Sequence, residues 1–160
     1  MKLRKIFRTG LTALAVPMVG MATAGAADGV CNLNASKASG TYGYATEGIA
    51  TGSNPFAPVG PFAQGGTVTL NAEGGNASIL TGEWSVSLYQ NDANGYTPDV
   101  TFGGTFQVSK ETCSGEFYVN APVQIAQPSF HVVFVANGDE VRTVALLPNL
   151  IVSYSTAKKL

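Results

Sequence analysis

Apolar and polar residues alternate along much of this chain, and one such stretch runs from Phe130 to Leu146. This stretch predicts two β-strands joined at Asn137-Gly138, a dipeptide that favours the type I′ turn because both central residues take positive φ. Pairing outward from Ala136 opposite Asp139 predicts one nearly apolar face and one mixed face, as expected of a sheet with one side on a core. The first face holds Phe130, Val132, Phe134, Val141, Thr143 and Ala145, and the second holds His131, Val133, Val135, Glu140, Arg142 and Val144.

The same period of two predicts further strands, and no stretch has the 3.6-residue apolar period of a helix. The cleanest alternation lies in Ala77–Gln90, where Trp84, Val86 and Leu88 point one way. Segments rich in Gly, Pro, Asn and other polar residues separate or flank the strands. They are a lead-in over Asp28–Ser39, a long Pro-containing loop over Thr51–Phe62, turns at Asn71–Asn76 and Asn91–Gly95, a loop over Ala121–Pro128 and a polar tail over Ser155–Leu160. Besides the hairpin, the expected strands are Gly40–Ile49, Gly65–Leu70, Ala77–Gln90, Val100–Val108, Ser114–Val119 and Leu150–Tyr154.

About eight short strands with turn signals between them predict an all-β fold, an antiparallel barrel, with a two-sheet β-sandwich as the alternative. A closed barrel of this size has an interior that side chains fill or that holds one small ligand. An outer-membrane barrel needs strands of about 9–11 residues. The strands expected here are mostly shorter and broken by glycine, which argues against that class.

The first 26 residues have the pattern of a secretory signal peptide. Lys2, Arg4, Lys5 and Arg8 form a basic segment, an apolar core runs from Leu11 to Val19, and small residues follow. The apolar core is about half the roughly 20 residues that a spanning helix needs. We therefore expect residues 27–160 to form one exported domain, secreted or periplasmic and without a membrane anchor after cleavage.

Removal of the leader changes the charge, because it holds four of the nine Lys and Arg and none of the ten Asp and Glu. The resulting net charge is about −5, and a chain with this excess of acidic residues is not expected to bind nucleic acid, whose phosphates attract basic surfaces. Export favours a disulfide between Cys31 and Cys113, the two cysteines of the chain. Two thiols and one histidine do not make a zinc ligand set, so no metal or other cofactor is predicted.

Three motifs carry a resemblance to known proteins. They are Gly40-Thr41-Tyr42-Gly43-Tyr44 after a cysteine, Gly104-Thr105-Phe106-x-Val108 leading to Cys113-Ser114-Gly115, and the Val133–Arg142 turn region. Together they resemble small secreted bacterial proteins of unknown function with a lipocalin-like or allene oxide cyclase/dirigent-like β-barrel. The resemblance spans most of residues 27–160 and implies the fold alone, because no catalytic motif of the cyclases is present. The segments Thr51–Phe62 and Asn91–Pro98 depart from it.

Candidate functional residues are few. His131 is the only histidine and lies diagonally across the hairpin from Arg142 in the expected register, so the two are candidates for orienting a ligand. Tyr42, Tyr44 and Tyr118 are candidates for lining a pocket with hydroxyl groups. Each has an ordinary alternative, as an exposed or structural strand residue. The carboxylates of Glu47, Glu83 and Glu116 are either an acid–base set in a lumen or solvated outer residues.

These observations leave three classes of function open. The leading interpretation is a barrel that binds a small apolar molecule or serves as a stable extracellular module. The alternatives are a cyclase-like or isomerase-like enzyme, for which no catalytic residue is assigned, and a structural protein that self-associates. An interior packed solid by Trp84 and the Phe residues would argue against both ligand binding and catalysis.

Overall fold

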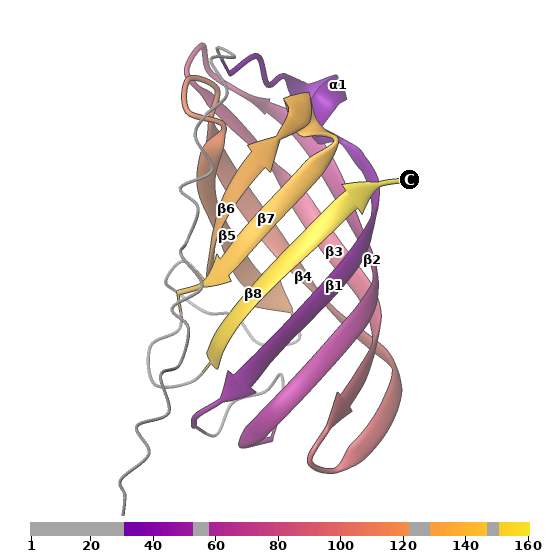
Figure 1. Ribbon diagram of the computed structural model, residues 1–160. Helices are drawn as coiled ribbons and strands as arrows, with labels where there is room; N and C mark the ends of the chain where they lie inside the picture. The colour runs from indigo at the N-terminus through magenta and orange to yellow at the C-terminus, as the bar shows by residue number, and fades with distance from the viewer. Residues whose placement is uncertain (1–30, 53–57, 122–128, 147–150) are drawn as a thin grey trace, which may run out of the picture.

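The computed structural model describes residues 31–52, 58–121, 129–146 and 151–160, and shows a closed antiparallel barrel (Figure 1). Each strand pairs with the next along the chain, and β8 pairs with β1 to close the barrel. The barrel prediction is therefore confirmed over the two-sheet sandwich, while the predicted signal peptide lies outside the described residues. The strands are β1 (Gly40–Ala50), β2 (Gly60–Gly75), β3 (Ile79–Asp92), β4 (Gly95–Ser109), β5 (Ser114–Ala121), β6 (Phe130–Val135), β7 (Glu140–Ala145) and β8 (Ile151–Lys159), with a short helix α1 (Ala35–Ala38) and a 3₁₀ turn η1 (Ala136–Gly138).

The β6–β7 hairpin has the register that the sequence predicts. Phe130 pairs with Ala145 and Phe134 with Val141, so the apolar face turns inward and the mixed face outward. Asn137 and Gly138 have φ of 59° and 99°, as the type I′ turn requires, and Asp139 N donates to Ala136 O at 3.3 Å. Ala136 also has positive φ, 49°, so the regular strand ladder ends one pair earlier, at Val135 and Glu140.

Several strands are longer than expected, which corrects the predicted boundaries. The prediction of a turn over Asn71–Asn76 is wrong for Asn71 to Gly75, because these residues belong to β2. They pair with β3 through a bulge between Ala72 and Gly74. A local sequence pattern predicts a turn wherever glycines cluster, but pairing with a neighbouring strand keeps a glycine-rich segment extended. Strands β2, β3 and β4 have 16, 14 and 15 residues, so the expected short strands are also wrong.

Other boundaries move in the same way. The predicted polar tail is mostly strand, since β8 runs to Lys159, with Ser155 and Ala157 buried on the inner face and Lys158 exposed on the outer face. The predicted loop 51–62 ends earlier, at the start of β2, and its residues 53–57 lie outside the described part. Asn91 and Asp92 belong to β3 and Gly95 to β4, which leaves a tight turn between them.

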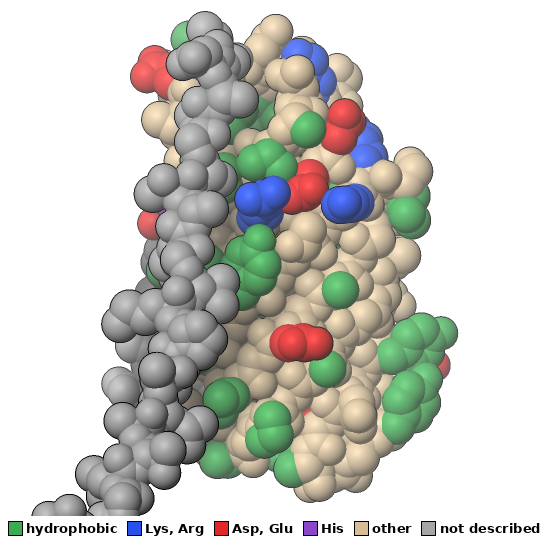
Figure 2. Space-filling model, in the orientation of Figure 1, with side chains coloured by type: hydrophobic (Ala, Val, Ile, Leu, Met, Phe, Trp, Pro, Cys, Tyr) green, Lys and Arg blue, Asp and Glu red, His purple; other side chains and the backbone are tan. Residues whose placement is uncertain are grey.

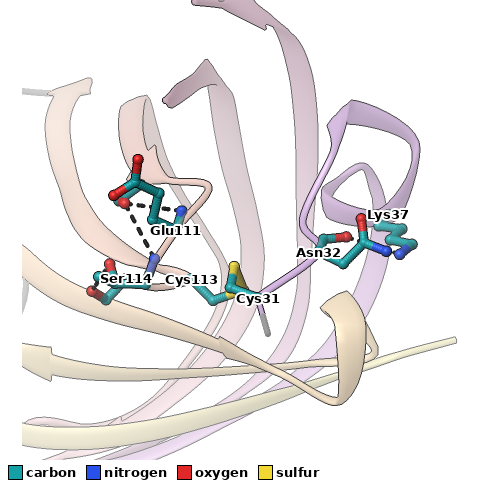
Figure 3. The surroundings of a disulfide bond; sticks show 8 residues. Cys31, Asn32, Lys37, Glu111, Cys113 and Ser114 are labelled. Atoms are coloured by element: carbon teal, nitrogen blue, oxygen red, sulfur yellow. Dashed lines mark hydrogen bonds between the residues drawn. A yellow bond between two sulfur atoms is a disulfide. The ribbon is translucent and has the colours of Figure 1, made fainter. Parts of the chain in front are cut away.

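One end of the barrel, here called the helix end, is closed by α1 (Figure 1). Asn34 caps α1 through a hydrogen bond from Lys37 N to its side chain. The disulfide between Cys31 and Cys113 ties the segment before α1 to the β4–β5 turn, with Cα atoms 5.5 Å apart, which confirms the predicted pairing (Figure 3). The interior beneath α1 is filled by buried side chains, among them Leu33, Ala38, Tyr42, Leu80, Phe106, Val108, Val132 and Phe134.

Candidate functional site

The middle of the barrel is less completely filled than the helix end. A cavity of about 30 Å³, here called the central cavity, is lined by residues from all eight strands. A second cavity of about 20 Å³, the far cavity, lies toward the end of the barrel opposite α1. Each has room for about one water molecule. The side chains of Tyr44, Phe102 and Phe130 line both cavities and separate them.

One wall of the central cavity is aromatic. The Trp84 ring stacks on Phe117, with centroids 5.3 Å apart, and meets Phe102 and Phe130 edge-on at 5.6 and 6.2 Å. Trp84 Nε1 donates to the carbonyl oxygens of Thr105 and Tyr118, both at 3.1 Å, which holds the indole in one orientation. The geometry is that of favourable stacked and T-shaped aromatic pairs around a fixed central ring.

The opposite wall carries hydroxyl groups from β7, β8 and β1. The side chains of Thr143 and Ser155 are hydrogen-bonded to each other, and Tyr44 bonds the side chains of Ser155 and Thr46. Thr46 Oγ1 in turn donates to Tyr154 O at 2.9 Å. Burial raises the pKa of Tyr44, an effect that its two hydrogen bonds reduce without reversing, so the phenol is neutral at physiological pH.

A second polar cluster lies beside the far cavity. Gln64 Nε2 donates to Gln90 Oε1 at 2.6 Å, and Gln90 Nε2 donates to Asp92 Oδ2 at 2.5 Å. Both glutamines are buried. Within the described part of the chain, no buried side-chain nitrogen or oxygen lacks a hydrogen-bond partner. The interior polar groups therefore form satisfied networks rather than isolated defects.

Of the five residues that the sequence singles out for ligand binding, only Tyr44 lines the two cavities. Tyr42 is buried at the helix end, where its hydroxyl donates to backbone carbonyls. Tyr118 lies on the outer face and donates to Glu116 Oε2 at 2.8 Å, a bond that raises the pKa of Tyr118. His131 and Arg142 occupy the outer face of the hairpin, in the diagonal relation expected from its register.

The charged residues of the site prediction also face outward. Arg142 Nε pairs with Glu140 Oε1 at 2.6 Å on the surface. Glu47, Glu83 and Glu116 take outward positions on three different strands, so they do not meet inside the barrel. Among the described residues, no group of three His, Cys, Asp or Glu side chains is placed to hold a metal ion.

The sequence reading missed most of the interior polar residues, namely Thr46, Gln64, Gln90 and Ser155. Strand parity is the signal for them, because each lies an even number of residues from a buried apolar residue of its own strand. Thr143 was placed on the inner face by the hairpin register. Ser155 falls in the segment that the sequence pattern predicts as a polar tail, so its inward position in β8 is not predicted.

The fold and its interior define a closed eight-stranded barrel in which neighbouring strands follow one another, the architecture of lipocalin-like proteins. The chain matches no protein-family model, and comparisons with curated proteins and with solved structures find no match. In the described residues, no helix has the length and apolar character needed to cross a membrane.

Proposed function

We propose that this is an exported barrel that binds a small apolar molecule in the middle of its interior. The observation that carries the proposal is the arrangement of aromatic rings on one wall and hydroxyl groups on the other, with the central and far cavities between them. Satisfied polar pairs in a core can be replaced by apolar residues with little loss of stability. Their presence beside a cavity supports a role in orienting a ligand.

Export is part of the same proposal. The leader pattern of residues 1–26 and the disulfide both favour an oxidising compartment. Strand length no longer argues against lipid contact, but the middle of the outer face of β2, β3 and β4 does. Its outward positions there carry small hydroxyl side chains rather than an apolar band, namely Thr67, Thr69, Ser85, Ser87 and Thr101.

The available space decides how a ligand enters. An engineered apolar cavity that binds benzene measures about 150 Å³, whereas the central and far cavities measure about 30 and 20 Å³. A ligand must therefore displace one of the side chains between them, Tyr44, Phe102 or Phe130. Binding then selects a conformation in which that side chain has moved. Apart from these two water-sized cavities, the interior is filled by side chains.

The enzyme alternative has less support. The residues that line the two cavities include no carboxylate, His, Lys, Arg or Cys. Tyr44 is the single titratable group among them. Acid–base chemistry needs a group whose pKa lies near the operating pH, and burial moves the pKa of Tyr44 in the opposite direction.

The test is a titration of the pure folded protein with benzene and naphthalene, followed by the fluorescence of Trp84, the only tryptophan in the chain. We expect a saturable change and a rise in melting temperature, because a ligand that binds only the native state stabilises it. Ala157 lines the central cavity and Ala45 is exposed on β1. Ala157→Val should therefore weaken binding, and the matched Ala45→Val should not. No saturable change in the wild-type protein, or equal effects of the two variants, contradicts the proposal.

A second candidate function, self-association, rests on a patch on the outer face of β1, β7 and β8. Its residues are adjacent in the register, with Val144 opposite Tyr154 and Ile49 opposite Val152, and their exposed fractions are 49–67%. Hydrophobic side chains lie over the lower ends of β8 and β1 in Figure 2. Light scattering tests it: a dimer that Val152→Lys dissociates, and that Thr101→Lys on another face does not, supports association. A monomer at all concentrations removes it.

A further inference from the structure

We propose that the ligand is a compact, neutral aromatic molecule with one hydrogen-bonding group, of the phenol or indole class. This inference rests on the proposed function and specifies the chemistry of its ligand. It follows from three properties of the interior: the absence of charge in the cavity walls, the aromatic cluster around Trp84, and the row of hydroxyl groups that includes Tyr44.

The walls of the two cavities contain no charged side chain. An ionised ligand placed there would lose its hydration without gaining a counter-ion, which is costly in a low-dielectric interior. The carboxylate of Asp92, which accepts a hydrogen bond from buried Gln90, lies next to the far cavity's glutamine cluster. A negative charge at that position further disfavours fatty acids and other carboxylates.

The aromatic cluster indicates the shape of the ligand. Phe102 and Phe130 each present a ring edge-on to Trp84, with interplanar angles of 87°. A ligand that displaces either side chain leaves Trp84 without that contact unless it supplies a ring of its own. An aromatic ligand restores the T-shaped pair, which contributes about 0.5–1.5 kcal/mol beyond area burial, whereas an alkyl chain does not. The filled helix end, with Tyr42, Phe106 and Val132 buried, leaves no space for a long chain.

The hydroxyl row indicates one polar group on the ligand. Thr143, Ser155, Tyr44 and Thr46 form a continuous chain of hydrogen bonds along the wall opposite Trp84. A hydroxyl oxygen has two acceptor sites and one proton, so Tyr44 and Ser155 can accept one more donor from a ligand without breaking this chain. A single O–H or N–H group is enough to join it.

The experiment compares three probes of similar size: phenol, toluene, which lacks the hydroxyl group, and benzoate, which is charged. We expect phenol to bind roughly three- to tenfold more tightly than toluene, the effect of one hydrogen bond, and benzoate to bind more weakly than both. Tyr44→Phe removes one of the two acceptors and should reduce the preference for phenol over toluene while toluene still binds, which also shows that the variant is folded. Tyr89→Phe removes the same hydroxyl group from an exposed tyrosine of β3 and should preserve the preference.

Phe130→Ala distinguishes an error in the proposed ligand class from a failure of interior binding itself, because it removes a ring that lines both cavities. We expect it to tighten the binding of toluene and phenol by enlarging the space beside Trp84. If toluene and phenol bind the wild-type protein equally, or if benzoate binds most tightly, the ligand class is wrong while interior binding stands. If no probe binds either the wild-type protein or Phe130→Ala, the proposed function itself fails.

Discussion

The hydroxyl of Tyr42 donates a hydrogen bond to the carbonyl oxygen of Gly138 at 2.8 Å, across a sequence separation of 96 residues. The same hydroxyl lies 3.0 Å from Ala38 O, so it joins β1, the end of α1 and the β6–β7 turn. Lys159 adds to this junction, with Nζ 2.9 Å from Lys37 O and 5.7 Å from the centre of the Tyr42 ring. Tyr42 therefore holds the helix end closed, a structural role at one of the positions singled out for ligand binding.

Tyr42→Phe removes this hydroxyl and leaves two buried carbonyl oxygens without that partner. We expect the free energy of unfolding to fall by about 1–3 kcal/mol, the cost of unsatisfied buried groups. Urea unfolding measures it. Tyr89→Phe is the matched control, because Tyr89 is exposed and should change stability by no more than about 0.5 kcal/mol. Equal effects of the two substitutions would show that the junction contributes nothing specific.

Alkaline pH should weaken the same junction. Burial and the nearby Asp139 carboxylate raise the pKa of Tyr42 to about 12, above the value of about 10 for an unfolded tyrosine. Because the unfolded chain loses this proton first, the contribution to stability is complete below about pH 10 and is lost between about pH 10 and the folded pKa. We expect wild-type stability to fall more steeply from about pH 10 to about pH 12 than that of Tyr42→Phe. Parallel pH profiles would contradict this assignment.

Reduction of the disulfide should lower stability substantially. Cys31 and Cys113 are 82 residues apart in sequence, and a chain-entropy estimate for a loop of that size gives about 4–5 kcal/mol. Urea unfolding of the oxidised protein and of a Cys31→Ser/Cys113→Ser variant measures the difference. A variant as stable as the oxidised protein would show that the tie before α1 is dispensable.

Gly104 lies where the bulge in the β4–β5 pairing brings two strands close together. A Cβ atom there would lie 1.8 Å from Tyr118 O, a carbonyl that also accepts the Trp84 indole N–H. Gly104→Ala should cost about 1–3 kcal/mol through overpacking and should shift Trp84 fluorescence. Gly74→Ala is the matched control, because a Cβ at Gly74 meets nothing within 4 Å. Unchanged fluorescence in Gly104→Ala would argue against the coupling between this carbonyl and the indole.

His131 and Arg142 face solvent, so their removal should leave ligand binding unchanged. The Arg142–Glu140 pair has exposed side-chain fractions of 41% and 18%, and surface pairs of this kind contribute about 0–1 kcal/mol. We expect His131→Ala and Arg142→Ala to bind phenol as the wild-type protein does and to unfold within about 1 kcal/mol of it. Weakened binding in either variant would move the site from the interior to the outer face.

Comparison of the hairpin with the rest of the chain shows how far sequence patterns extend. The register from Phe130 to Ala145 follows from local alternation and from the Asn137-Gly138 turn, and both are properties of neighbouring residues. The end of β2 does not follow from them, because Gly74 and Gly75 stay extended only through their pairing with β3. Of the five residues that the sequence predicts for ligand binding, only Tyr44 lines the two cavities.

The sequence by itself determined the all-β class, the approximate number of strands, the inward face of the hairpin and the cysteine pair, because each depends on side-chain alternation or on residue content. The tertiary structure decided which strand closes the barrel and which polar residues face its interior. Pairing of β8 with β1 turns Ser155 toward Tyr44. Tyr42 lies only two residues before Tyr44 and on the same face of β1, but the shape of the barrel places it under α1. Such relations join residues about a hundred positions apart, and no local period encodes them.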